Sequence, residues 1–424
     1  MTLEVLKEIV SSQKDIYNLL DEARENKKVW KHRASSTTSF LANPLHYALA
    51  QGLGIFFGST DKTLIGTAVH SVVDYAYSNP NKGVFGAIKE IIKSVNEEFK
   101  KLQKDLVSKV DKQELKKEAF RLFKVYYNEV LLNNRNSFVA SEEYLEVDVP
   151  LGMYKNPNNF GKIMLTGTFD RLYKDNDGFI LGDLKTSANK INGICEKSQE
   201  LQNFEAEIVS LEKLKLELEK TTSKFINAEN NCKQIMDEKA QIQIAINNAT
   251  LNKKPIKALE NKLAKLESEF EKWIENLERL VEAENSILKI NNRLSILEEK
   301  SAPLFAEYEK NKALADLESC KSQYGFQVAL YSLMYMIVHG VEIKKVRLEI
   351  IVKTKVPQIQ LFEWELDNET LRRAEETIQM VVSTIEAFYD GVSSSLLFRP
   401  NPYTFYGSET NNFINLLNGD NMKS

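Results

Sequence analysis

The segment LTGTFDRLYKDNDGFILGDLKTS, residues 165–187, holds two aspartates and a lysine whose types and spacing permit metal or acid–base chemistry. Two alternating apolar runs flank the polar turn KDNDG, which predicts a β-hairpin. Because side chains alternate between the faces of a strand, Asp183 and Lys185 share one face, and antiparallel pairing can bring Asp170 close to them. A surface hairpin with solvated charged ends is the alternative interpretation of these residues.

The oxygen atoms of this segment predict a particular kind of metal. Two carboxylates and the main-chain carbonyl of Leu184 would form an all-oxygen pocket suited to Mg²⁺ or Mn²⁺. Lys185 beside such an ion could orient or deprotonate a water molecule, or stabilise a pentacovalent phosphate.

Four further polar residues lie on elements that could position them near this pocket. Glu143 lies on the mostly apolar face of a predicted strand, residues 137–150, where an unpaired carboxylate is costly. His70 lies inside a predicted helix, and a neutral imidazole can bind a metal. Gln327 and Tyr331 are four apart on a predicted helix and share a face. The ordinary alternatives are a strand-edge acid, a hydrogen-bonded core histidine and an amphipathic helix surface.

Residues 196–312 differ in kind from the rest of the chain, because they contain no glycine and are dominated by Glu, Lys, Leu, Asn and Ile. Apolar residues recur every seven positions at Phe204, Leu211, Leu218, Phe225 and Cys232, and again at Leu259, Leu266, Trp273, Leu280, Ile287 and Leu294. The polar segment NNATLNKKP lies between the two series. This pattern predicts an antiparallel coiled-coil hairpin with arms about 75 Å long. The turn and Pro255 disfavour one very long helix.

Composition limits the class of protein. Apolar residues make up 43% and charged residues 27% of the 424 residues, which is typical of a soluble globular protein with two or three domains. The three cysteines are far apart, which fits a reducing compartment and excludes a disulfide scaffold or a zinc site. We expect no membrane span and no secretory signal, and therefore a cytoplasmic location.

The net charge of −4 does not indicate a nucleic-acid partner, so any basic surface must be local. A group of basic residues follows the predicted Gln327–Tyr331 helix and is the better candidate for contacts to a phosphate backbone. Its members are Lys344, Lys345, Arg347, Lys353 and Lys355. The lysine-rich segment 100–124 has interleaved acids and is more typical of a solvated helix face.

The order of the motifs carries a resemblance. S-x(3)-F-x(2)-N-P at 36–44 is followed by G-T-A-V-H, the Glu143 strand, G-T-F-D, D-L-K-T-S and Q-V-A-L-Y. This order resembles the PD-(D/E)XK nuclease superfamily, in particular its RecB/AddB-like exonuclease branch, which is related to the CRISPR-associated iron–sulfur nucleases. The resemblance covers residues 35–190 and 320–407, and the predicted coiled coil interrupts it.

The resemblance implies an α/β fold: a restriction-endonuclease-like mixed sheet core flanked by helices, here with a long inserted antiparallel coiled-coil hairpin. The expected division is an N-terminal helix at 1–34, the core at 35–195 and 316–424, and the hairpin at 196–315. The implied roles are metal binding by His70, Asp170, Asp183 and the Leu184 carbonyl, a place near the metal for Glu143, catalysis by Lys185, and support by Gln327 and Tyr331.

Two departures from the family pattern are informative. Asn43 stands where iron–sulfur members carry a cysteine, and the segment FRPNPYTFYGSETNNF contains no cysteine. We therefore predict no iron–sulfur cluster. No Walker A sequence occurs, so we expect no bound nucleotide.

The resemblance implies a deoxyribonuclease that depends on Mg²⁺ or Mn²⁺. We expect an exonuclease of recombination, repair or phage DNA metabolism, acting in the cytoplasm, or in the host cytoplasm if phage-encoded. The alternative is a nuclease-fold scaffold without catalysis, or a complex subunit, that acts through its coiled coil. In either case we expect the coiled coil to bind a protein partner or to mediate self-association.

Overall fold

The computed structural model describes residues 16–26, 29–55, 60–101 and 109–401 of the chain. The chain divides into two compact units. We call Met1–Asn192 together with Leu317–Ser424 the sheet unit, and Gly193–Asp316 the hairpin unit. No helix of the described part of the chain is both long enough and apolar enough to span a membrane.

The sheet unit is built on one mixed, six-stranded sheet in which β2 pairs with β3 beside the path β1-β3-β4-β5-β6. Pairing is parallel for β1–β3 and β4–β5 and antiparallel for β2–β3, β3–β4 and β5–β6. The strands are β1 (Trp30–Arg33), β2 (Phe138–Asp148), β3 (Ile163–Lys174), β4 (Phe179–Ser187), β5 (Ile343–Val352) and β6 (Gln358–Glu365). The predicted mixed sheet is confirmed.

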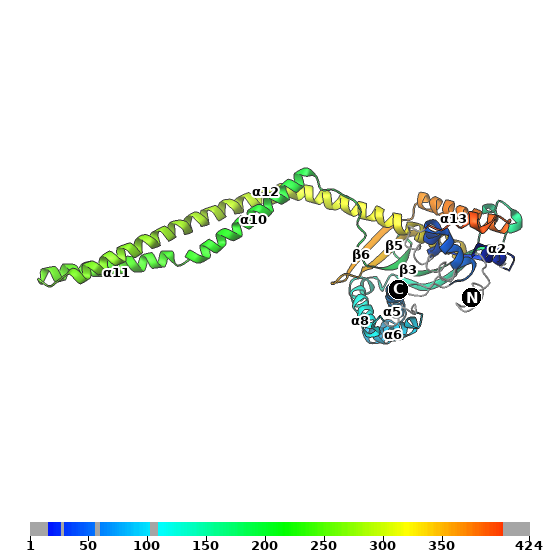
Figure 1. Ribbon diagram of the computed structural model, residues 1–424, viewed down its shortest axis with the longest axis horizontal. Coiled ribbons are helices and arrows are strands. Elements are labelled where there is room, and N and C mark those ends of the chain that lie inside the picture. The colour runs from blue at the N-terminus through cyan, green and yellow to red at the C-terminus, as the bar shows by residue number, and fades with distance from the viewer. Residues whose placement is uncertain (1–15, 27–28, 56–59, 102–108, 402–424) are drawn as a thin grey trace. The chain divides into compact units, whose positions relative to one another are not determined.

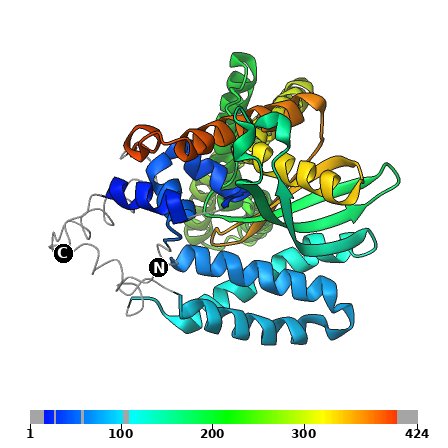
Figure 2. The same ribbon diagram turned by 90° about the vertical axis from the view of Figure 1, so that its right-hand side faces the viewer.

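Helices cover both faces of this sheet. In Figures 1 and 2, α5, α6 and α8 lie on one side of the sheet and α2 and α13 on the other. The helices of this unit are α2 (Ile16–Asn26), α3 (Thr37–Ala42), α4 (Pro44–Tyr47), α5 (Asp61–Ser78), α6 (Gly83–Phe99), α8 (Lys112–Tyr126), α9 (Leu132–Asn134), α13 (Asn368–Tyr389), α14 (Ser394–Leu397) and the last part of α12 (Lys257–His339).

Each face has its own apolar core, set by the alternation of side chains along the strands. Leu181, Leu348 and Ile350 belong to the core shared with α12 and α13. Leu184 and Ile351 belong to the core shared with α5, α6 and α8. The parity of β4 therefore places Asp183 and Lys185 on the α12 face and Leu184 on the α5 face.

One edge of β3 is only partly paired, and this gap positions the candidate site. β1 pairs with residues 163–166 of β3, and β4 pairs with residues 171–174. Between them, residues 167–170 have no partner strand on that edge, because β4 turns away to pair with β5 alone. Asp170 and Asp183 stand where β3 and β4 diverge. We call this opening the fork.

The hairpin unit contains α10 (Gln199–Phe225), α11 (Ala228–Leu251) and the first part of α12. α11 and α12 pack through an apolar cluster that includes Ile235, Ile242 and Leu266. The turn between them lies at residues 252–256, so the predicted antiparallel hairpin is confirmed (Figure 1). The break between α10 and α11 was not visible in the heptad pattern, and Pro303 lies inside α12.

The start of the chain differs from the single helix expected over residues 1–34. The described helix is α2, and Trp30–Arg33 forms strand β1 instead. Trp30 and His32 are fully buried while their neighbours are exposed, so alternating burial favours a strand that four residues are too few to reveal in the sequence. Residues 1–15 of the expected helix, and residues 402–424 of the cysteine-free tail, lie outside the described residues.

Candidate active site

Asp170 bridges the fork. Its Oδ2 accepts a hydrogen bond of 2.6 Å from the main-chain N–H of Leu184, and its Oδ1 lies 3.3 Å from Nδ1 of His70 on α5. The structure thus brings together two predicted residues that are 100 positions apart in the sequence. Burial by itself raises the pKa of Asp170, but His70, Lys185 and Arg171 outweigh it and hold this pKa below its ordinary value.

Asp183 and Lys185 form an ion pair, with 2.7 Å between Oδ2 and Nζ. Only 2% of Asp183 is exposed. Burial raises the pKa of Asp183, and the nearby carboxylate of Asp170 adds to this rise, while Lys185 opposes it. Burial lowers the pKa of Lys185, but Asp183 and Asp170 raise it further, so the net pKa is above its ordinary value. The carboxylate of this pair is therefore buried, whereas the Lys185 side chain remains 24% exposed.

The Leu184 carbonyl faces the same opening. The N–H and C=O of one strand residue point to the same edge of the strand, and the Leu184 N–H points toward Asp170. The carbonyl is therefore directed into the fork rather than toward β5. The site thus offers the oxygen donors expected from the sequence, which are the carboxylates of Asp170 and Asp183 and the carbonyl of Leu184.

Gln327 and Tyr331 meet as a pair on α12, where Gln327 Nε2 donates a 3.2 Å hydrogen bond to the Tyr331 hydroxyl. Tyr331 packs against Gly167 on the unpaired stretch of β3, where a Cβ atom would stand 2.5 Å from the ring carbon Cε1. Burial and the charge of Asp183 raise the pKa of Tyr331 to about 12, although Lys185 opposes the rise. Glycine at 167 therefore permits the close approach of this tyrosine to the fork.

Glu143 lies apart from these residues. Its Oε1 lies 2.6 Å from Nε2 of His339, at the end of α12. Glu142 lies between Ser141 and Glu143, which pair with the neighbours of Asp170, Arg171 and Phe169. Burial together with Asp74 and Asp170 raises the pKa of Glu142, although the residue is exposed. Glu142 was not predicted from the sequence, because strand alternation places it on the face opposite the apolar one.

The backbone of β2 explains this shift. The register slips between Phe138 and Ala140, which is a β-bulge, and Glu142 has a left-handed φ of 49°. Ser141 therefore turns toward α5, where its hydroxyl donates to Oδ1 of Asp74, one helical turn after His70. A positive φ at a residue other than glycine is uncommon and stores strain, which is often found at functional sites.

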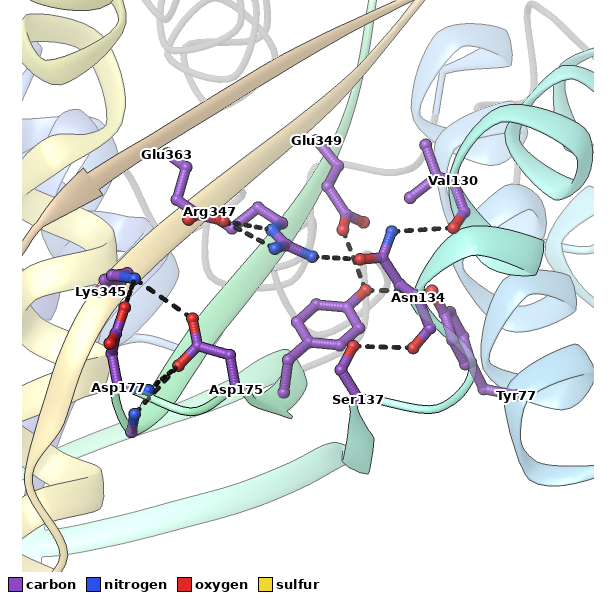
Figure 3. A network of polar contacts seen from close by, with 12 residues as sticks. Tyr77, Val130, Asn134, Ser137, Asp175, Asp177, Lys345, Arg347, Glu349 and Glu363 are labelled. Carbon is purple, nitrogen blue, oxygen red and sulfur yellow. Dashed lines mark hydrogen bonds and ion pairs between the residues drawn. The ribbon is translucent and has the colours of Figure 1, made fainter.

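The predicted basic group is divided between the two ends of β5. Lys345 is paired with Asp175 and Asp177, and Arg347 with Glu363, as Figure 3 shows. Lys344 is paired with Glu342 in the same way. These three charges are therefore compensated within the sheet unit, beside the β3–β4 turn.

Lys353 and Lys355 follow the other end of β5, about 30 Å along an extended strand. The main-chain N–H of Lys353 donates to Ser187 at the end of β4, two residues after Lys185. Of the five basic residues, these two lie at the end of the sheet that carries the fork.

The donor set fits a divalent cation, although it is not a finished metal site. Among the residues that the structure describes, no group of three or more His, Cys, Asp or Glu side chains is already arranged as metal ligands. In the described part of the chain, the buried Oδ2 of Asp183 has its ion pair to Lys185 and no further hydrogen bond. Carboxylate oxygens, a carbonyl and one imidazole nitrogen are donors that Mg²⁺ and Mn²⁺ accept.

Comparison with known proteins places the chain in a family. The family model described as the PD-(D/E)XK nuclease superfamily matches residues 34–287, which is more than half of the chain. Among solved structures, a candidate exonuclease from Eubacterium rectale matches with 10% identity and a TM-score of 0.38, covering 87% of this chain and 84% of the other. No curated protein matches. The family match includes the fork but ends before Gln327. On that match, the chain belongs to the PD-(D/E)XK nuclease superfamily and has its restriction-endonuclease-like core.

Proposed function

We propose that this protein is a metal-dependent deoxyribonuclease that hydrolyses phosphodiester bonds, and that it works as an exonuclease of the RecB/AddB-like branch. The observation that supports this most is the fork, where Asp170, Asp183 and Lys185 are held within hydrogen-bonding or ion-pair distance of one another or of the intervening Leu184. Recombination, repair and phage DNA metabolism are the processes that fit such an activity, and the cytoplasm is the compartment that fits them.

The metal ligands in this proposal are His70, Asp170, Asp183 and the Leu184 carbonyl. In this proposal Glu142 replaces Glu143 near the metal, because Glu142 is next to the strand segment opposite Asp170 and the charges of Asp170 and His70 affect its pKa. A bound Mg²⁺ or Mn²⁺ would polarise the phosphate and lower the pKa of a coordinated water molecule. We propose no iron–sulfur cluster and no bound nucleotide.

The protein's own side chains have separable tasks in this account. Asp183 holds Lys185 by the 2.7 Å ion pair, so that the ammonium group faces the charge that develops on the scissile phosphate. Gln327 fixes the Tyr331 hydroxyl, and the tyrosine ring keeps water from the α12 side of the pair. Lys353 and Lys355 are the proposed contacts to the DNA backbone, which carry no sequence preference.

The mode of cleavage is tested with three DNA substrates of equal length: linear, covalently closed circular, and linear with both ends blocked. Each is incubated with Mg²⁺, with Mn²⁺, or with a chelator. We expect degradation of the linear DNA alone, and only with metal. Equal cleavage of the circle would make the protein an endonuclease, and no cleavage of any substrate would remove the proposed activity.

The hairpin unit supports a second proposal, that it binds a protein partner or a second copy of the chain. Large apolar side chains are exposed along it, among them Val209, Ile226 and Leu251. A complex subunit or a scaffold without catalysis would use this surface in the same way. Replacement of the segment 199–312 by a short linker should abolish complex formation and leave cleavage of linear DNA intact.

A further inference from the structure

A buried ion pair lies beneath the fork, on the opposite face of the sheet from Asp183 and Lys185. Arg171 on β3 is 1% exposed and Glu349 on β5 is fully buried. Arg171 Nη1 donates to Glu349 Oε2 over 3.3 Å. The two residues are 178 positions apart in the sequence, and the α5 and α8 helices cover them.

The position of this pair relative to the fork is specific. Arg171 directly follows Asp170 and pairs in register with Gly182, which directly precedes Asp183. Glu349 pairs in register with Leu184, whose N–H is bound by Asp170. The ion pair therefore joins β3 to β5 across β4, at the level where β3 and β4 part.

Tyrosine hydroxyl groups complete the contacts of Glu349. Tyr126 on α8 donates to Oε2 over 2.5 Å, and Tyr173 on β3 donates to Oε1 over 2.9 Å. The Tyr77 hydroxyl lies 3.2 Å from that of Tyr173. Figure 3 shows Glu349 and Tyr77 in this network, together with Arg347, which reaches Asn134. Both oxygens of the carboxylate are thus held by donors from one strand, β3, and one helix, α8.

Gly182 makes the crossing possible. A Cβ atom at this position would stand 2.7 Å from Cε2 of Tyr173, so only glycine lets the tyrosine ring pass over β4 to reach Glu349. The same residue pairs with Arg171 on one side and Arg347 on the other. The G-D-L-K sequence therefore contains both the glycine that lets Tyr173 reach Glu349 and the Asp183 and Lys185 side chains of the fork.

Stability alone is a poor reason for such a pair. Burying two charges costs desolvation energy, and apolar replacements of a whole buried ion pair are often neutral or stabilising. Arg171 Nε is, in addition, buried without a hydrogen-bond partner in the described residues. The pair instead holds β3, β4 and β5 in fixed positions relative to one another at the point where the fork opens.

We propose that Arg171 and Glu349 are positioning residues, which hold β3 and β4 at the separation that lets Asp170 reach the Leu184 N–H and share the fork with Asp183. This inference rests on the proposed nuclease function of the fork. Residues that orient metal ligands from behind typically change metal affinity 10- to 100-fold when they are replaced.

The test compares the single variants Arg171→Met and Glu349→Gln with the double variant that carries both. The double variant leaves no lone buried charge and keeps an oxygen acceptor for the tyrosine hydroxyls, so we expect its thermal midpoint to recover most of the loss seen in the singles. The matched control is Glu386→Gln, which alters a buried carboxylate that accepts two main-chain N–H groups away from the fork.

Two readouts follow the fork itself. Hydrogen exchange of the Leu184 amide in metal-free protein reports the contact with Asp170, and Mn²⁺ binding followed by electron paramagnetic resonance reports the ligands. In the double variant we expect at least tenfold faster exchange and about tenfold weaker Mn²⁺ binding. We also expect a lower kcat with the KM for DNA within about twofold. The control should match wild type in both readouts.

The outcomes separate this inference from the function on which it rests. A stable double variant with wild-type exchange, Mn²⁺ affinity and kcat would overturn the positioning role and leave the nuclease proposal intact. A wild-type protein that neither binds Mn²⁺ nor cleaves DNA would overturn the nuclease proposal first. If the arginine variants do not fold, Tyr126→Phe combined with Tyr173→Phe loosens Glu349 instead, and an unchanged Leu184 exchange rate there contradicts the role.

Discussion

Two ion pairs with buried carboxylates lie close together on opposite faces of one sheet, and they differ in how their polar atoms are satisfied. Both oxygens of Glu349 accept hydrogen bonds, from Arg171, Tyr126 and Tyr173. Within the described residues, the Oδ2 of Asp183 has its ion pair with Lys185 and no further hydrogen bond. A buried carboxylate whose hydrogen bonds are all made stabilises the structure. A buried carboxylate that lacks some of its hydrogen bonds can still bind a ligand. In the proposed function, this difference distinguishes the Arg171–Glu349 pair, assigned to positioning, from the Asp183–Lys185 pair, assigned to cleavage.

The strongest test of the comparison removes the charge of Asp183. Asp183→Asn should lower the rate of DNA cleavage at least about a thousandfold, because the amide is a poor ligand for a hard cation. Burial raises the pKa of Asp183, so the neutral amide should leave the thermal midpoint of the metal-free protein within a few degrees. Single-turnover kinetics and thermal unfolding measure the two effects. A large loss of stability would show that Asp183 mainly stabilises the fold.

Two adjacent acids on β2 sharpen the comparison. Glu142→Gln should weaken Mn²⁺ binding by up to about a hundredfold, because Glu142 is close enough to Asp170 and His70 for their charges to affect its pKa. Glu143→Gln should leave it within about twofold, because Glu143 is paired with His339 instead. Calorimetric titration of both variants measures the difference, and the reverse order would restore the residue expected from the sequence.

A further prediction concerns His32, a buried residue that stabilises the fold and lies away from both ion pairs. It is fully buried between the hydroxyls of Tyr47 and Thr37, and burial lowers its pKa to about 3. The unfolded chain takes up a proton near pH 6.5 and the folded chain does not, so stability is complete above that pH and falls below it. Between pH 7 and pH 5 the loss should be about 2 kcal/mol.

Denaturant unfolding of wild type and His32→Gln at the two pH values checks this prediction. The variant should be less stable at pH 7 but should lose about 2 kcal/mol less between the two pH values. Parallel pH dependence of the two proteins would show that His32 titrates in the folded state as it does in the unfolded chain.

The smallest expected effect concerns packing at the rim of the fork. Gly167→Ala would place a Cβ atom 2.5 Å from the Tyr331 ring, so the ring must move. We expect about a tenfold lower kcat and a loss of about 1–3 kcal/mol in stability. Tyr331→Phe in the same background should relieve none of the clash, since only the hydroxyl is removed. A wild-type rate for Gly167→Ala would exclude Tyr331 from the site.

Much of the fold could be predicted from local patterns. Heptads predicted the hairpin, and unbroken alternation along β4 placed Asp183 and Lys185 on one face. On β2, alternation holds from Glu143 to Asp148, but the bulge after Phe138 and the left-handed φ of Glu142 interrupt it before that. A single sequence gives no local sign of either feature.

Ion pairs between residues that are far apart in the sequence could not be predicted either. The basic residues Lys345 and Arg347 appeared free for DNA because their partners Asp177 and Glu363 come from other segments of the chain. The pair of Arg171 and Glu349 could not be predicted, because nothing in the sequence distinguishes either residue from other charged residues before the sheet brings them together. The roles of His70, Gln327 and Tyr331 in catalysis stay predictions until they are measured.

The central claim is that Lys185 and Asp183 form the reactive half of the fork. The most direct measurement is the single-turnover rate on linear DNA with Mn²⁺ for wild type, Lys185→Ala and the control Lys31→Ala. Lys31 is also paired with a carboxylate, Glu146, but lies on β1. The account predicts at least about a thousandfold loss for Lys185→Ala and none for Lys31→Ala. Equal rates for wild type and Lys185→Ala would contradict it.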